Sequence, residues 1–389
     1  MHRVLGPSRP LPALPRNQGL DVLRGLAILL VLLNHLAPYT IPGFVAPSGA
    51  AGFLYWHIKE FGTTGVDLFF VLSGFLISGL LFKELARSQR IDFPRFWLRR
   101  AFKILPSYLL LLLILWICGT TAWSARPWTH LLFLQNYLDN STNGPTWSLA
   151  VEEHFYLVFP LSLLVLGATT LSRPLLFRGL LVASIIGITA MRSFHLTEVV
   201  KNNDFMLSHF RMDSLAMGVL ARHLLHTSAW PARAIQSRPW VATLCVLGFL
   251  VPALFLFRMH PFMFSAGNGL LAIGYGILVL LAAQLAPSRN LAITAVARVG
   301  RWSYNIYLWH FFLLILPIPG YAFSQHALTR SLEPGMLRYS LQFLLFVLVA
   351  LALGGLLTRW FEQPILDVRD RILPGTPRDR PSESEAMPR

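Results

Sequence analysis

Long apolar segments recur along the whole chain, and they constrain the fold more than any other feature. A helix that crosses the hydrocarbon core of a bilayer needs about 20 mostly apolar residues. Such windows cover residues 20–38, 64–82, 103–120, 147–167, 176–193, 209–226, 239–257, 267–286, 301–317 and 337–358. The sequence therefore predicts an all-α polytopic membrane protein, a bundle of about ten transmembrane helices.

The composition and the placement of charge agree with a membrane protein. Of 389 residues, 54% are hydrophobic and 13% charged, and the net charge is +15. The basic residues lie between the apolar windows, which indicates membrane orientation and argues against nucleic-acid binding. Cys118 and Cys245 each lie in an apolar run, so no disulfide framework is expected.

Lys and Arg alternate between rich and poor connections, and this alternation predicts the topology. The segment before the first window and the even-numbered connections are the richer ones. Because cytoplasmic loops carry the excess of Lys and Arg, we expect both termini on the cytoplasmic side of the membrane. The predicted units are a cytoplasmic segment over residues 1–19, a membrane domain over 20–358 and a disordered cytoplasmic tail over 359–389.

Arg24 and His35 are two polar residues in the first apolar window. Eleven residues correspond to just over three helical turns, so both side chains lie on one face, roughly 16 Å apart along the axis. Singly, Arg24 is compatible with an interfacial arginine and His35 with a packing histidine. Together they predict a polar path that crosses the bundle.

The fourth window carries Glu152 and Glu153, roughly 8 Å from its outer end. His35 is expected at a similar depth, so the sequence predicts His35 as a general base with a carboxylate partner. Ser148 and Tyr156 lie one turn from Glu152, whereas leucines flank Glu153, so we predict Glu152 as the partner. The alternative is a buried polar pair that only holds two helices together.

Further polar groups interrupt other windows. Arg99, Arg100 and Lys103 form a basic patch at the start of the third window, which suits ordinary cytoplasmic charge or a phosphate-rich ligand. No helix carries histidines and carboxylates at metal-ligand spacing, so no metal site is predicted. The remaining candidates for the site are Asp67, Ser73, Arg211, Asp213, Tyr304 and His310.

Six motifs in order resemble the membrane-bound acyltransferase 3 family of bacteria. They are Arg24 and His35 as Arg-x10-His, then "GVDLFFVLSGFLI", "RRAFKILPSY", "TWSLAVEEHFYL", "RMDSLAMG" and "SYNIYLWH". Lys103 stands where the family pattern has arginine, and His154 where glutamine is commoner. The resemblance implies O-acylation of a carbohydrate hydroxyl, with the acyl group drawn from cytoplasmic acyl-CoA, and no appended hydrolase-like domain is expected.

The resemblance also suggests a mechanism. Acyl-CoA, expected to be acetyl-CoA, would enter from the cytoplasm with its phosphates on the basic patch and Arg24 along its path. His35 would deprotonate the acceptor hydroxyl, and Ser73, Tyr304 or another hydroxyl would stabilise the oxyanion. The donor is a substrate, so no permanently bound cofactor is expected. The expected partners are the lipid bilayer of a bacterial plasma membrane, acyl-CoA and a carbohydrate acceptor.

Several alternatives remain open from the sequence. Direct transfer and a covalent acyl-enzyme are both compatible with these residues. A secondary transporter or exporter of an organic anion or glycan precursor would also use intramembrane charges, although no inverted repeat is evident. A scaffold with a degenerate site is a third, weaker reading, and the oligomeric state stays undetermined.

Overall fold

A computed structural model describes residues 17–35, 49–118, 126–138, 146–196, 204–256, 260–315, 332 and 335–373. The described residues are helical, with short connections and no β-strand among them. The predicted all-α class is confirmed.

Each of the ten apolar windows coincides with a long helix. Seven helical stretches in the described residues are long and apolar enough to cross a membrane, or eight if the bent pair of α11 (Trp230–Ser237) and α12 counts as one. The helices at the ten windows are α1 (Gln18–His35), α3 (Gly65–Ser88), α4 (Phe93–Ile117), α7 (Thr146–Ser172), α8 (Pro174–Phe194), α10 (Met212–Thr227), α12 (Pro239–Phe255), α13 (Asn268–Ala282), α14 (Leu291–Ile315) and α15 (Met336–Leu357). The polytopic membrane class is therefore confirmed.

Helices α10 and α14 do not meet that criterion of length and apolarity. Helix α10 has only 16 residues. Helix α14 has 25 residues, but Arg298, Arg301, Asn305 and His310 interrupt its apolar character. Asn305 and His310 are fully buried, so these polar groups face neighbouring helices and not lipid.

Two of the helical segments outside the ten windows extend predicted membrane helices. Helix α2 (Gly49–Phe61) continues through the short 3₁₀ turn η2 (Gly62–Thr64) into α3. At the other end, the π-helical turn η7 (Thr358–Glu362) links α15 to α16 (Gln363–Ile372). The predicted disordered tail from residue 359 is wrong for residues 359–372, where Pro364 occupies the first turn that tolerates proline. Residues 374–389 lie outside the described residues.

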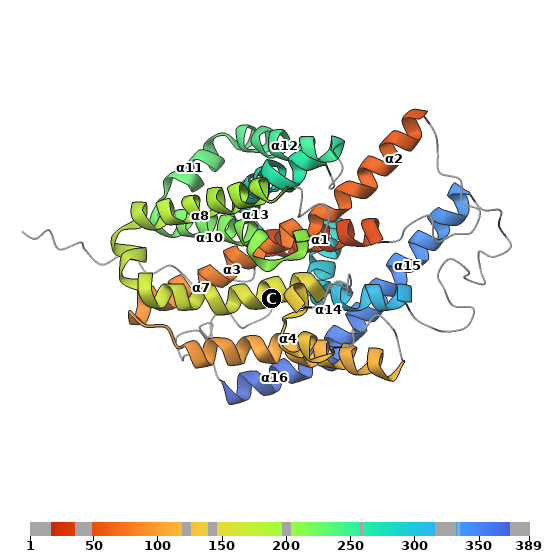
Figure 1. Ribbon diagram of the computed structural model, residues 1–389, viewed down its shortest axis with the longest axis horizontal. Coiled ribbons are helices and arrows are strands. Elements are labelled where there is room, and N and C mark those ends of the chain that lie inside the picture. Colours follow the sequence, from red (N-terminus) through yellow and green to blue (C-terminus); the bar gives the residue numbers. More distant parts are fainter. Residues whose placement is uncertain are drawn as a thin grey trace, which may run out of the picture.

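Helix α1 lies near the centre of the bundle, between the edge formed by α11 and α12 and the opposite edge formed by α4 and α16 (Figure 1). Glycines let its backbone approach α14 closely. A Cβ added at Gly25 would lie 2.2 Å from the Val296 carbonyl oxygen, and one at Gly300 would lie 1.8 Å from that of Asp21. Small residues at helix contacts are the usual way to pack helices in lipid, so these glycines fix α1 against α14.

Large apolar side chains cover the outside of the bundle. Trp116 and Val165, for example, are 73% and 82% exposed in the isolated protein. An apolar surface of this kind suits a protein surrounded by lipid. Cys118 and Cys245 are both free, in agreement with the absence of a disulfide framework.

Candidate active site

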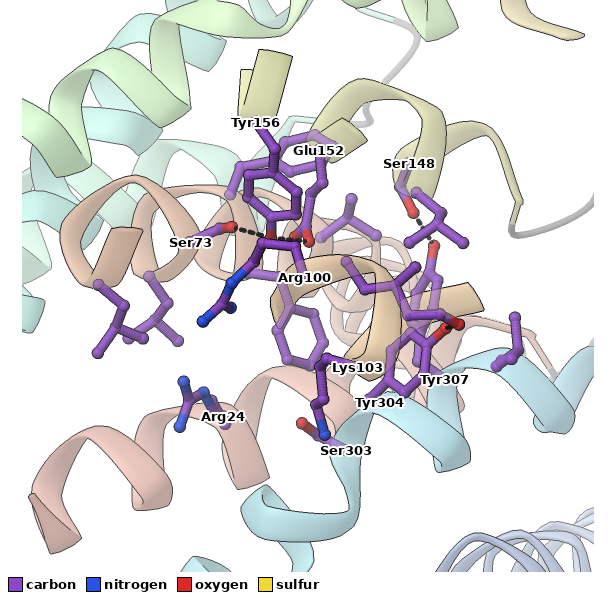
Figure 2. A pocket seen from close by; sticks show the side chains of 18 residues that line it. Arg24, Ser73, Arg100, Lys103, Ser148, Glu152, Tyr156, Ser303, Tyr304 and Tyr307 are labelled. Atoms are coloured by element: carbon purple, nitrogen blue, oxygen red, sulfur yellow. Dashed lines mark hydrogen bonds between the residues drawn. The ribbon is translucent and has the colours of Figure 1, made fainter. Parts of the chain in front are cut away.

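Five helices, α1, α3, α4, α7 and α14, surround a cavity of about 180 Å³. Six of the thirteen predicted site residues line this cavity, although they are far apart in sequence: Arg24, Ser73, Arg100, Lys103, Glu152 and Tyr304. The polar residues that line it are Arg24, Ser73, Arg100, Lys103, Ser148, Glu152, Tyr156, Ser303, Tyr304 and Tyr307 (Figure 2).

A chain of three hydrogen-bonded side chains crosses one wall of the cavity. The Tyr156 hydroxyl donates to Glu152 Oε2 at 2.7 Å, and Ser73 Oγ lies 2.7 Å from the same hydroxyl. Because the single hydrogen of Tyr156 is used on Glu152, Ser73 must be the donor to Tyr156. The order Ser73, Tyr156, Glu152 is therefore a route along which a proton can move toward the carboxylate.

Cationic groups gather at one end of the cavity. Arg24 and Arg100 lie on the same side in Figure 2, away from the Ser148–Tyr307 pair. Arg24 Nη1 is 3.0 Å from Asp21 Oδ1. Arg100 forms no ion pair in the part of the chain that the structure describes, and its Nε is buried without a hydrogen-bond partner. Arg100 is thus the lining cation most available to an anionic ligand.

The predicted basic patch is divided between two environments. Lys103 lines the cavity and pairs with Glu362, which also accepts a hydrogen bond from Asn305. Arg99 does not line the cavity: it contacts α16, with Nη2 3.0 Å from Asp370 Oδ1. Adjacent residues on a helix point about 100° apart, so Arg99 and Arg100 cannot both face the cavity. Glu362 was not predicted as a site residue, because its position after the last apolar window suggested a disordered tail.

His35 lies at the end of α1 and not in the wall of the cavity. Its Nδ1 is 2.8 Å from the Val31 carbonyl oxygen, which can only accept, so Nδ1 carries the proton. In the neutral ring, Nε2 is then the atom that can take up a proton. The His310 ring packs edge-on against His35, with 4.8 Å between centroids.

Tyr307 and His310 connect the cavity with His35. Tyr307 lines the cavity and its hydroxyl lies 2.5 Å from Ser148 Oγ. His310 Nδ1 donates to the Tyr307 carbonyl oxygen at 2.6 Å, and His310 Nε2 is buried without a partner. Polar side chains of His310, Tyr307 and Ser148 therefore extend from His35 to the wall of the cavity.

The structure does not pair Glu152 with His35, and that part of the prediction is wrong. Trp147, near the start of α7, packs against Phe70, five residues inside α3, with 6.0 Å between ring centroids. Helix α7 therefore begins deeper in the bundle than its sequence suggests. Glu152 consequently lines the same cavity as Arg24 and Arg100. The depth at which each helix begins relative to its neighbours is set by packing, and the apolar windows do not reveal that packing.

Asp67, Arg211 and Asp213 form buried ion pairs outside the cavity lining. Arg211 pairs with Asp67, and Arg192 Nη2 lies 2.6 Å from Asp213 Oδ2. All four side chains are at most 1% exposed, so their geometry indicates that they link helices. Arg192 was not predicted, because it sits at the end of a window where a basic residue looks like ordinary interfacial charge.

The orientation of α7 provides a test of the two adjacent glutamates. Glu152 lines the cavity, whereas Glu153 does not, and Glu153 Oε1 is buried without a partner. Glu152→Gln is expected to lower activity at least about tenfold, because the carboxylate that accepts from Tyr156 becomes a neutral amide and the hydrogen bond loses its charge. Glu153→Gln is expected to retain a substantial fraction of the wild-type activity. Equal losses, measured at matched membrane levels, would contradict this assignment.

The family and the two relatives described next are all named as acyltransferases. The sequence model of a family described as an acyltransferase domain matches residues 17–359. O-acetyltransferase OatA of Staphylococcus aureus (strain NCTC 8325 / PS 47) is 26% identical over 327 residues, which cover 76% of this chain and 50% of that protein. A putative O-acetyltransferase of Staphylococcus aureus (strain COL) is 28% identical over 331 residues, 75% of this chain and 50% of that protein.

The chain thus spans about half the length of the curated relatives it matches. No solved structure matches it. Among the described residues, no group of three or more His, Cys, Asp or Glu side chains is placed to hold a metal ion.

Proposed function

This chain belongs to the acyltransferase 3 family, and on that premise we propose that it transfers an acyl group from acyl-CoA to a carbohydrate hydroxyl. The acyl group is acetyl, in keeping with the O-acetyltransferase names of its relatives. The acceptor is a surface polysaccharide, a lipid-linked sugar or a glycosylated small molecule. The family assignment favours this activity over the transporter alternative.

The observation that carries the proposal is a cavity with cations at one end and a polar run that leads to His35. A cavity of about 180 Å³ is close to one that accommodates benzene, about 150 Å³. It suits the part of the donor's arm next to the acyl group but not the nucleotide. The nucleotide phosphates would stay at the mouth, where Arg24, Arg100 and Lys103 supply positive charge.

The chemical step takes place beyond the cavity, beside His35. The acceptor hydroxyl gives its proton to His35 Nε2, and its oxygen attacks the thioester carbonyl. The CoA thiolate leaves and recovers the proton from His35. Glu152, Tyr156 and Ser73 line the path of the donor, and direct transfer requires no covalent intermediate on them.

A test of the function uses the purified full chain in lipid nanodiscs. Labelled acetyl-CoA is added together with cell-envelope glycan from a bacterium that lacks the protein. Label is expected in a glycan fraction that mild alkali releases, because O-acetyl esters are alkali-labile. The His35→Ala protein serves as the matched control. Label that never exceeds the level of this control would argue against the proposal.

The donor site makes a prediction that separates two neighbouring arginines. Arg100→Ala is expected to raise the KM for acetyl-CoA about tenfold, because a charge-assisted contact with phosphate is lost, and to change kcat less. Arg99→Ala is expected to have a smaller effect, since Arg99 is held by Asp370 and the Leu373 carbonyl oxygen. Steady-state kinetics measure both. If the two variants raise KM equally, the phosphates bind outside the cavity mouth.

The proposed site also requires an orientation in the plasma membrane, with both termini cytoplasmic. Lys and Arg in the connections support this orientation. Reporter fusions after residues 90 and 389 are expected to read cytoplasmic, and fusions near residues 50 and 140 to read extracytoplasmic. A periplasmic reading after residue 90 would reverse the membrane sides of the donor and acceptor.

A further inference from the structure

Lys59 is a buried cation beside His35 that the site described so far does not use. It is the only Lys or Arg between residues 36 and 64, and it lies near the end of α2. Only 7% of Lys59 is exposed. A lysine that served only for membrane orientation would extend its ammonium group to water, so the burial of Lys59 calls for another explanation.

The packing of α2 against α1 brings Lys59 to the end of α1. Asn34, next to His35, donates from Nδ2 to the Lys59 carbonyl oxygen at 3.3 Å. One turn later in sequence, a Cβ added at Gly62 would lie 2.5 Å from the Leu30 carbonyl oxygen. These contacts place the buried Lys59 beside the end of α1 that carries His35.

Lys59 has no carboxylate in an ion pair with it in the described part of the chain. The adjacent Glu60 lines a different pocket together with Thr63, Thr64 and Asp67. The rings that the structure records against His35 are those of His310 and Phe311. Neither of them is an anion.

This charge distribution is suited to a reaction that generates negative charge. When His35 takes a proton, the site holds an imidazolium and an ammonium with no ion-paired carboxylate to balance them. An oxyanion on the substrate would neutralise one of these two charges, and it exists only during the reaction. Groups that stabilise charge developed in the transition state accelerate the chemical step and leave binding of the ground state unchanged.

We propose that Lys59 stabilises the oxyanion of the tetrahedral intermediate. This inference rests on the proposed function. The acceptor oxygen forms a bond to the thioester carbon while its proton passes to His35 Nε2, and the carbonyl electron pair moves onto oxygen beside the Lys59 ammonium. The intermediate then re-forms the carbonyl, the carbon–sulfur bond breaks, and the thiolate takes the proton from His35.

The same arrangement predicts that Lys59 acts whichever nucleophile attacks. Water in place of the acceptor would give slow hydrolysis of acetyl-CoA through the same oxyanion. A lysine that recognised an acidic group on the acceptor would affect transfer but not this hydrolysis. Release of labelled acetate from acetyl-CoA without acceptor therefore separates the two roles.

The experiment compares Lys59→Met and Lys59→Arg with Lys83→Met, which removes a lysine charge from the other end of α3. Lys59→Met is expected to lower kcat for glycan transfer and for acetyl-CoA hydrolysis by about 10²-fold each, with KM for acetyl-CoA unchanged. Lys59→Arg keeps the charge and should recover most of the loss, and Lys83→Met should resemble the wild type. Thermal unfolding in detergent checks that each variant is folded, and Lys59→Gln replaces Lys59→Met if that protein is unfolded.

Each other outcome overturns the assignment. Hydrolysis at the wild-type rate with impaired transfer would make Lys59 a contact for the acceptor. If kcat of Lys59→Arg is no higher than that of Lys59→Met, the positive charge of Lys59 does not contribute to the reaction. If Lys59→Met behaves like the wild type while His35→Ala is inactive, Lys59 has no part in the reaction and the proposed function stands. An inactive wild type would contradict the proposed function itself.

Discussion

His35→Ala is expected to leave a folded, membrane-inserted protein whose acetyl transfer is reduced about 10²-fold or more, the usual scale for loss of a general base. The backbone bond of Nδ1 to Val31 fixes the ring so that Nε2 is the basic atom. Alanine removes that atom and leaves the donor cavity, which His35 does not line, intact. Labelled acetyl transfer at saturating acetyl-CoA measures the loss.

His57→Ala is the matched control for that experiment. His57 is also buried, and its Nδ1 likewise lies close to a backbone carbonyl oxygen one turn earlier, that of Phe53 at 2.6 Å. The control removes an imidazole of similar burial and is expected to retain most of the activity. Transfer by His35→Ala at the rate of the His57→Ala protein would exclude His35 as the base.

The second large effect concerns stability. Asp67→Ala is expected to destabilise the protein by about 3–5 kcal/mol, the cost of leaving one partner of a buried ion pair without its counter-charge. Arg211, its partner, is 1% exposed and also packs over the rings of Phe70 and Trp147, 5.7 and 5.9 Å from their centroids. A lower midpoint of unfolding in detergent and a smaller folded fraction in membranes are the measurements.

The double variant Asp67→Ala/Arg211→Met tests whether the loss arises from the orphaned charge. Removing both charges leaves no unpaired ion, so the double variant is expected to be more stable than Asp67→Ala alone. If it is less stable by the sum of the two single effects, the two residues act independently and the pair has no energetic coupling.

The helices were largely predictable because the bilayer restricts the possibilities so severely. Each apolar window coincides with a helix, since a segment in lipid must satisfy its own backbone hydrogen bonds. Helix α2 and helix α16 were not predicted. They are shorter, and their polar residues, Lys59 and Glu60 in one and Asp367 to Arg371 in the other, reduce the apolar signal on which the windows depend.

The sequence predicted several of the residues that line the candidate site, but not which of them contact each other. Polar residues in apolar windows are costly unless they face the bundle interior, so Arg24, Ser73, Arg100 and Glu152 could be identified singly. Their partners depend on how far each helix is shifted along its neighbours. That shift is fixed by contacts such as Gly25 against α14, which no periodicity in one segment specifies. The predicted His35–Glu152 pair was wrong for this reason.

The carboxylates that pair with cations at the cavity mouth have a consequence for how an anionic donor would bind. Glu362 already pairs with Lys103, and Asp21 with Arg24, so an arriving phosphate exchanges one anion for another at these two cations. Binding would then resemble ion exchange, with most of the net attraction left to Arg100. Because the displaced anions are part of the chain and not salt ions, affinity would depend on ionic strength less steeply than the number of cations at the mouth suggests.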